Sequence, residues 1–226
     1  TITVTGTNDA PVATFVAAQT ATEAGEVVSG QLTSSDVDAS DEATYALVGD
    51  AIEGLTINAD GRWTFDPTVG AYAHLAAGAE QEITVEYLVE DGNGGSDTAS
   101  FTITVTGTND APVATFTEAQ TLAEASEISG SVSASDTDDG AVLSYALVGA
   151  AIEGLTFSAD GSWDFDATHG EYDYLAVGES ADVTVNYSVT DENGGTDTAS
   201  FTITVTGTND APVATFVAAQ TATEAG

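Results

Sequence analysis

The side chains best suited to chemistry in this chain are carboxylates and amides that recur in short loops. One loop reads Asp36-Val37-Asp38, and its counterpart 100 residues later reads Asp136-Thr137-Asp138. A glycine-rich turn begins at Asp91 and again at Asp191. These side chains offer hard oxygen ligands without His or Cys at equivalent positions, a set that favours calcium over zinc or copper. The same residue types also populate ordinary solvated turns, and the sequence leaves that alternative open.

The overall charge also favours a cation ligand. The chain has 37 Asp and Glu residues against a single Lys or Arg, for a formal net charge of −36, and it has no cysteine. Nucleic acid is excluded as a partner, because its binding depends on cationic side chains that neutralise phosphates. Direct membrane insertion is also not expected, because no stretch is apolar enough to span a bilayer. Acidic side chains in such number repel one another and need positive charge to neutralise them, and multivalent cations are the natural candidate.

A tandem repeat places these acidic loops. The stretch Thr98–Phe116 recurs unchanged at Thr198–Phe216, and its second part also opens the chain. Each copy joins an alternating strand pattern to Gly and Asn-Asp-x-Pro, which end a strand and continue the chain in extended form. We interpret each copy as a joint between domains. The predicted domains are the last strand of a preceding repeat (1–6), repeat unit 1 (7–107), repeat unit 2 (108–207) and the first strand segment of a following repeat (208–226).

Each unit is predicted to be an all-β sandwich. About seven short strands separated by turn signals are typical of two-sheet, immunoglobulin-like folds, so we expect tandem Ig-like or cadherin-like β-sandwiches joined end to end. Trp63, Phe65, Tyr87 and Phe101 are expected to fill the core of the first unit. Val69–Glu80 lacks strand alternation and is expected to contain one helical turn. The expected strands are Pro11–Thr22, Gly25–Ser34, Tyr45–Leu47, Leu55–Ile57, Trp63–Phe65, Ile83–Val89 and Thr98–Thr106.

This topology predicts where the acidic residues meet. In such a sandwich two loops, between the second and third strands and between the last two strands, return to the pole at which the first strand enters. Asp136–Asp139 and Asp191–Asn193 are therefore expected to surround the incoming linker Asn109-Asp110. Glu23, in the bend between the first two strands, is expected at the exit pole of the preceding unit. Residues far apart in sequence would then meet at the joint.

Taken together, these motifs resemble a known family. Glu23, Asp36-Val37-Asp38, Asp60-Gly61-Arg62-Trp63, the turn Asp91–Gly95 and the linker Asn109–Pro112 are similar to the VCBS-type cadherin-like repeat. This repeat occurs in tandem in giant bacterial RTX adhesins that type I secretion systems export to the cell surface. The resemblance covers essentially every residue of both units. It implies an extracellular location and a calcium-stiffened extender role.

The resemblance also implies a set of ligands for Ca2+. In cadherins an acidic residue in the first bend, an Asp-x-Asp loop, a later Asp and an Asn-Asp linker share calcium ions at each joint. The matching residues are Glu23, Asn109, Asp110, Asp136, Asp138 and Asp191 at the central joint; Asn8, Asp9, Asp36, Asp38 and Asp91 in an N-terminal half-site; and Glu124, Asn209 and Asp210 in a C-terminal half-site. Only the central joint has the full set, so we expect it to bind most tightly.

Three functions remain open on the sequence. The first is a stalk that projects a distant ligand-binding region for cell adhesion and biofilm formation, with neighbouring repeats of the same chain as its partners and any glycan or surface ligand bound elsewhere. The second is a module that itself binds glycan or the repeats of a neighbouring cell. The third and most remote is a carboxylate-based hydrolase. We expect no enzyme, because neither His74 nor His169 recurs in the other unit and no nucleophile with a base can be assigned.

Overall fold

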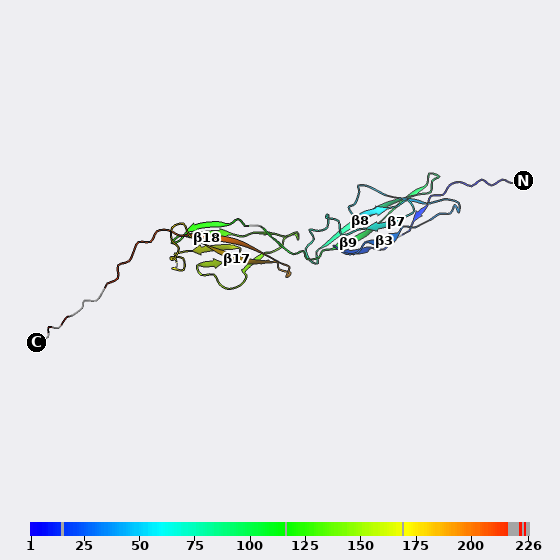
Figure 1. Ribbon diagram of the computed structural model, residues 1–226. Helices are drawn as coiled ribbons and strands as arrows, with labels where there is room; N and C mark the ends of the chain where they lie inside the picture. The colour runs from blue at the N-terminus through cyan, green and yellow to red at the C-terminus, as the bar shows by residue number, and fades with distance from the viewer. Residues whose placement is uncertain (15, 116, 169, 217–221, 223, 225–226) are drawn as a thin grey trace. The chain divides into compact units, whose positions relative to one another are not determined.

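The computed structural model describes residues 1–14, 16–115, 117–168, 170–216, 222 and 224. These residues form strands and turns without a helix, which confirms the all-β prediction (Figure 1). No helix among them is long and apolar enough to cross a membrane. The chain divides into two compact units, unit 1 with Thr1–Val113, Ser135–Leu143 and Thr190–Thr196, and unit 2 with Ala114–Ala134, Ser144–Val189 and Asp197–Gly226.

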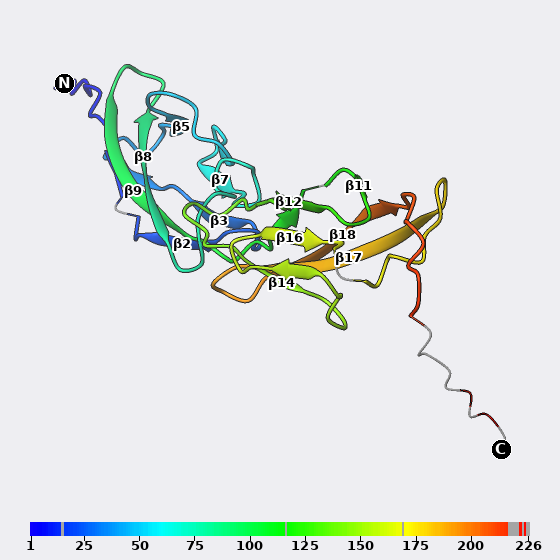
Figure 2. The same ribbon diagram turned by 90° about the vertical axis from the view of Figure 1, so that its left-hand side faces the viewer.

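The first sandwich has two main layers. One is a four-stranded sheet in the order β2-β9-β8-β5, and the other is a three-stranded sheet in the order β3-β7-β6, with β1 paired to β4. The long strands β8 and β9 run side by side in both views (Figures 1 and 2). The strands are β1 (Val12–Ala13), β2 (Gln19–Thr22), β3 (Val28–Gln31), β4 (Ser34–Ser35), β5 (Thr44–Leu47), β6 (Leu55–Ile57), β7 (Arg62–Phe65), β8 (Glu80–Glu90) and β9 (Ser96–Thr106).

The second sandwich repeats this topology. Its sheets have the orders β11-β18-β17-β14 and β12-β16-β15, and β10 pairs with β13. Figure 2 shows β14, β17 and β18 as neighbours in the four-stranded sheet. The strands are β10 (Val113–Ala114), β11 (Gln120–Ala123), β12 (Glu127–Ser131), β13 (Ala134–Ser135), β14 (Ser144–Leu147), β15 (Leu155–Phe157), β16 (Ser162–Asp166), β17 (Ser180–Thr190) and β18 (Thr196–Thr206).

The predicted core residues are buried, as expected from their strand positions. Trp63 packs on Phe101 with ring centroids 5.0 Å apart, and Tyr87 also packs on Phe101, with a centroid distance of 6.4 Å. Alternation along β8 and β9 turns every second residue inward, so the buried side chains of the two strands form one face. Gly30 stands beneath the indole of Trp63, because a Cβ there would lie 2.7 Å from the ring. The second sandwich has the same aromatic contacts.

The expected first strand, Pro11–Thr22, is divided between two sheets, the small β1-β4 pair and the four-stranded sheet. Its first part is β1, where the backbone N–H of Ala13 donates to Asp97 Oδ2 at 2.9 Å. Its second part is β2, which pairs in parallel with β9. The expected strand Gly25–Ser34 is likewise divided, into β3 and β4. A strand that changes sheets exchanges one set of backbone partners for another, and the residues between the two pairings leave the ladder.

The segment Val69–Glu80 contains tight turns instead of the expected helical turn. The N–H of Tyr72 donates to the carbonyl of Val69 at 3.2 Å, and the N–H of Leu75 donates to that of Tyr72 at 3.1 Å. Each of these bonds spans three residues, so the chain makes two successive turns without an α-helical bond. The rings of Tyr72 and Phe65 are 5.4 Å apart, so the turns close the end of the core.

The chain ends do not test the predicted domain boundaries. Residues 1–10 are exposed and form no strand, and residues 207–216 also form none. The later part of the predicted first strand of a following repeat, at 217–221, 223 and 225–226, lies outside the described residues. The assignments of 1–6 and 208–226 to neighbouring repeats stay predictions.

Candidate metal sites in the acidic loops

Five residues, here called the linker cluster, meet around the connection that leads into the second repeat. They are Asn109, Asp110, Asp136, Asp138 and Asp191, and all lie within unit 1. Asn109 Nδ2 donates to Asp191 Oδ2 at 2.9 Å, and the N–H of Asp110 donates to Asp138 Oδ2 at 3.0 Å. The N–H of Asp138 in turn donates to Asp136 Oδ1 at 3.0 Å. The structure thus brings together the linker, the Asp-x-Asp loop and the later turn, as the topology predicts.

The same pattern recurs in the first repeat, in a set here called the first-repeat cluster. Asn8 Nδ2 donates to Asp91 Oδ2 at 2.8 Å, and the N–H of Asp9 donates to Asp38 Oδ2 at 2.8 Å. The N–H of Asp38 donates to Asp36 Oδ1 at 2.9 Å. Three equivalent hydrogen bonds in both clusters indicate a geometry that the repeat sequence itself specifies.

A local turn fixes the carboxylate of Asp91 in this geometry. Its Oδ1 accepts the N–H of Asn93 at 2.7 Å and that of Gly95 at 3.0 Å. Such bonds between an Asp side chain and its own turn are typical of Asx turns. The amide of Asn8 lowers the pKa of Asp91, and the N–H groups of Asn93 and Gly95 add to this effect against the opposing effect of burial. Asp91 therefore stays ionised although only 4% of its surface is exposed.

Asp138 is in a less favourable environment. Only 7% of its surface is exposed, and burial raises its pKa. The negative charges of Asp136, Asp110 and Asp191 raise it further, whereas the N–H of Asp110 lowers it. By contrast, the amide of Asn109 lowers the pKa of Asp191. The linker cluster therefore includes one carboxylate whose charge is costly without a positive neighbour.

Several oxygens in these clusters are shielded from solvent and accept no hydrogen bond among the described residues. They are Asn109 Oδ1, Asp136 Oδ2 and Asp138 Oδ1 in the linker cluster, and Asp36 Oδ2 and Asp41 Oδ2 in the first repeat. Buried polar atoms are normally paired, so oxygens of this kind require an explanation. Arg62 is the only Lys or Arg of the chain; its side chain is 76% exposed and lies 3.8 Å from Asp60. Unpaired hard oxygens of this kind fit a calcium ion.

The sequence analysis did not single out Asp41. Its carboxylate lies with those of Asp36 and Asp91 so that one oxygen from each falls within 4.8 Å of the others. The three residues line a pocket of about 210 Å³. The spacing Asp36, Asp38, Asp41 would have been the available signal, but Ala141 at the equivalent position of the second repeat removed it from the repeat pattern.

The two glutamates of the first bends take similar positions. The N–H of Thr108 donates to Glu23 Oε2 at 2.9 Å, one residue before Asn109. Thr208 donates its N–H and its hydroxyl to Glu124 Oε1. Glu124 is 4% exposed, and its Oε2 accepts no hydrogen bond among the described residues. The other two predicted C-terminal ligands, Asn209 and Asp210, are exposed. All of these residues stay predicted ligands.

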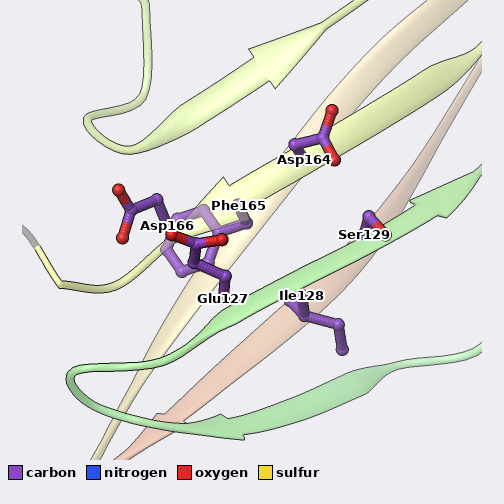
Figure 3. A pocket seen from close by; sticks show the side chains of 6 residues that line it. All are labelled: Glu127, Ile128, Ser129, Asp164, Phe165 and Asp166. Carbon is purple, nitrogen blue, oxygen red and sulfur yellow. The ribbon is translucent and has the colours of Figure 1, made fainter.

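A further acidic pocket lies on the second sandwich, between β12 and β16 (Figure 3). Glu127 and Asp166 are register partners at one end, and Asp164 stands opposite Ser129 further along the strands. A glycosidase needs two carboxylates flanking a sugar, usually held against an exposed aromatic face. The aromatic residue here, Phe165, is fully buried, so the pocket offers no such face. The hydrolase alternative gains no support from it.

Comparison with known proteins finds each repeat similar to a known class of bacterial domain. Residues 8–107 match the family model of the bacterial cadherin-like domain, and residues 109–204 match that of the bacterial Ig domain. A search of curated proteins gave no match. The chain thus consists of two cadherin-like or Ig-like β-sandwich domains in tandem.

Solved cadherin structures share this fold at low identity. The human protocadherin-24 EC1-2 structure has a TM-score of 0.57 at 18% identity, covering 90% of this chain and 100% of that chain. Mouse cadherin-23 EC22-24 has a TM-score of 0.54 at 17% identity, with 88% and 65% covered. The protocadherin gammaB4 extracellular domain has a TM-score of 0.51 at 20% identity. The match covers 87% of this chain but only 34% of that chain. At such identities the likeness shows the fold alone.

Proposed function

We propose that these repeats are a calcium-stiffened extender, or stalk, of a large bacterial cell-surface adhesin. In this role they project a distant ligand-binding region away from the cell, and their partners are the neighbouring repeats of the same chain. The similarity of both repeats to bacterial cadherin-like and Ig domains supports an extracellular adhesin-type region. Assignment to the VCBS-type RTX adhesins, with type I secretion and a role in biofilm formation, rests on the motif resemblance described above.

The observation that carries the proposal is the chemistry of the linker cluster. Asn109 and Asp110 are hydrogen-bonded to carboxylates from two different loops, and three buried oxygens of the cluster have no hydrogen-bond partner among the described residues. A calcium ion bound by these oxygens would join the linker to both loops by strong electrostatic contacts. Without the ion, the carboxylates repel one another and the linker is held by two hydrogen bonds. Calcium would therefore limit bending at the linker, the segment at which connected domains usually move relative to one another.

The test is a measurement of stiffness with and without calcium. Small-angle scattering of the chain in calcium should give a longer maximum dimension and a narrower distribution of distances than scattering in chelator. Asp138→Ala in calcium should resemble the chelated protein, and Glu42→Ala, which removes a neighbouring exposed charge of the first repeat, should resemble the wild type. Scattering curves that coincide in calcium and in chelator would contradict the extender role.

A further inference from the structure

Two of the seven asparagines of the chain are followed by glycine, and they occupy equivalent positions in the two repeats. They are Asn93 and Asn193, in the turns Asp91–Gly95 and Asp191–Gly195. The side-chain Cγ of an asparagine is an amide carbon, which the backbone nitrogen of the next residue can attack. A glycine in the next position has no side chain to obstruct that approach. Both positions are therefore candidates for a chemical modification.

The surroundings of both asparagines leave this reaction unobstructed. Asn93 and Asn193 are exposed, and their side-chain amides make no hydrogen bond with the described residues. The residues that follow them, Gly94 and Gly194, have φ angles of 107° and 96°, and nothing lies within 4 Å of a Cβ placed on either. Local motion of such a turn requires no repacking of buried side chains. The glycine nitrogen can therefore approach Cγ while the sandwich stays folded.

None of the other five asparagines is followed by glycine. Four of them also donate a side-chain hydrogen bond: Asn8, Asn58, Asn109 and Asn209. The fifth, Asn186, is exposed and makes no side-chain hydrogen bond with the described residues, but it lies within β17 and is followed by the buried ring of Tyr187. Reaction there requires the strand to open locally. Asn186 therefore serves as an internal reference for an exposed amide in a rigid setting.

We propose that Asn93 and Asn193 are modification sites, at which the side-chain amide converts spontaneously to a carboxylate. The nitrogen of the following glycine loses its proton and bonds to Cγ, while the bond from Cγ to Nδ2 breaks and Nδ2 leaves as ammonia with that proton. Water then opens the cyclic imide. Its attack at Cγ gives aspartate, and its attack at the main-chain carbonyl carbon gives isoaspartate, in which the backbone runs through Cβ and Cγ. Water is the only co-reactant, and the inference does not depend on calcium binding.

The modification disturbs the turn that holds the linker. Asp191 Oδ1 accepts the N–H of Asn193 at 2.8 Å and that of Gly195 at 2.9 Å. Its Oδ2 accepts the side-chain amide of Asn109 at 2.9 Å. Isoaspartate lengthens the backbone between the two N–H groups, so that both no longer reach the same oxygen in the present geometry. Either product also adds a negative charge near Asp191. A modified turn therefore holds its carboxylate, and through it the linker, less firmly.

The two turns differ in the residue that precedes the asparagine. Gly92, before Asn93, has a φ angle of 80° and nothing within 4 Å of a Cβ placed there. Its counterpart Glu192 anchors the second turn, because its Oε2 accepts the N–H of Val142 at 2.6 Å. An anchored turn samples fewer conformations in which the glycine nitrogen reaches Cγ. Asn93 should therefore convert faster than Asn193.

The experiment is peptide mapping by mass spectrometry after incubation of the full 226-residue chain at neutral and at alkaline pH. The acid form should accumulate at Asn93 and Asn193 about tenfold faster than at Asn186, the ratio that corresponds to an opening cost of about 1.4 kcal/mol for β17. The rates should rise with pH, because the glycine nitrogen must lose its proton before it attacks. Labelling with an isoaspartate-specific methyltransferase distinguishes isoaspartate from aspartate.

Two variants test the sites one at a time. Asn93→Gln lengthens an exposed side chain so that the amide carbon no longer forms the same five-membered ring; the acid form should be lost at position 93 and accumulate unchanged at Asn193. Glu192→Gly removes the anchor of the second turn and should raise the rate at Asn193 toward that at Asn93. Conversion that is equally fast at Asn186, or undetectable at both proposed sites, would overturn the inference.

The effect on the linker is measured on aged wild-type protein. Ion-exchange chromatography separates the modified chain by its added charge, and NMR then follows the side-chain amide signals of Asn8 and Asn109, which donate to the two turns. These signals should shift toward those of a solvent-exposed amide in the modified fraction and stay unchanged in the unmodified fraction. Coincident spectra of the two fractions would overturn the loosening of the linker.

Discussion

The two acidic clusters share their hydrogen bonds and differ in their unpaired oxygens. In both, a linker Asn donates to the Asp of the later turn, and a linker N–H donates to the second Asp of the Asp-x-Asp loop. Among the described residues, the buried oxygens without a hydrogen bond belong to Asp36 and Asp41 in the first cluster and to Asn109, Asp136 and Asp138 in the second, whereas Asn8, the counterpart of Asn109, is exposed. The hydrogen bonds thus place the linker in both clusters, and the buried oxygens without a hydrogen bond are candidate cation ligands.

This difference separates two effects of calcium that a single site would combine. A cation in the first-repeat cluster would join two loops of one sandwich and so stabilise that domain against unfolding. A cation in the linker cluster would join the chain segment between repeats to the loops that follow it. The first effect should appear in thermal stability, and the second in the stiffness of the linker.

The largest expected effect is that of removing calcium from the first repeat. Free calcium at 1,000 times its dissociation constant adds about 4 kcal/mol to the stability of the state that binds it. Trp163→Phe leaves Trp63, which is buried in the first core, as the only tryptophan to report unfolding. Chelator should lower the melting temperature recorded by its fluorescence. Melting curves that coincide in calcium and chelator would mean that the first domain carries no ion of its own.

The next effect comes from blocking the linker cluster sterically. A Cβ at Gly195 would overlap Asp191 Oδ2 and lie 2.8 Å from Asn109 Nδ2 and 2.9 Å from Ala111 Cα. Gly195→Ala should therefore weaken calcium binding at the linker cluster and cost about 1–3 kcal/mol of stability, as overpacking usually does. Gly70→Ala is the matched control, because nothing lies within 4 Å of a Cβ there. Calorimetry that finds calcium bound equally well by both variants would contradict the placement of this site.

A smaller effect, of opposite sign in two buffers, is expected for Asp138→Asn. Burial and three negative neighbours raise the pKa of Asp138, so the folded state without calcium is destabilised as the pH rises through that pKa. In chelator at neutral pH the asparagine should therefore stabilise the fold by about 1 kcal/mol, a common size for single substitutions. In calcium it should destabilise it, because a ligand charge is lost. Urea unfolding in the two buffers measures both signs, and Asp38→Asn provides the less buried comparison.

The smallest effect concerns an Asp outside both clusters. The N–H of Ala114 lowers the pKa of Asp197 through a 2.9 Å hydrogen bond to its Oδ2, and the N–H of Thr198 adds to this. Because the folded pKa is depressed, the stabilisation is present above the ordinary pKa of about 3.9 and is lost as the pH falls through the lower folded value. Asp197→Asn should therefore be less stable than the wild type at pH 6 and approach it near pH 3, as followed by unfolding in chelator. Its calcium midpoints should not change.

The sequence was informative where structure follows local rules. Alternation along Ile83–Val89 and Thr98–Thr106 correctly predicted the paired long strands, because a strand with one buried face has a period of two. The repeated Asn-Asp linker and Asp-x-Asp loops correctly predicted which segments meet, because the order of strands in a sandwich fixes the pole of each loop. The division of the first strand between sheets was missed, because its two halves have no turn signal of Gly or Pro between them.

The sequence by itself determined the repeat, the strands and the class of ligand atom in each acidic loop. These properties follow from residue type and short-range spacing, which the chain carries without reference to its fold. Only the tertiary structure decided that Asp41 faces Asp36 and Asp91, and that Asp138 is buried whereas Asp38 is only half-buried. The reason is that burial and the distances between carboxylates depend on loops that are about 50 residues apart in the sequence and become neighbours only when the two sheets pack.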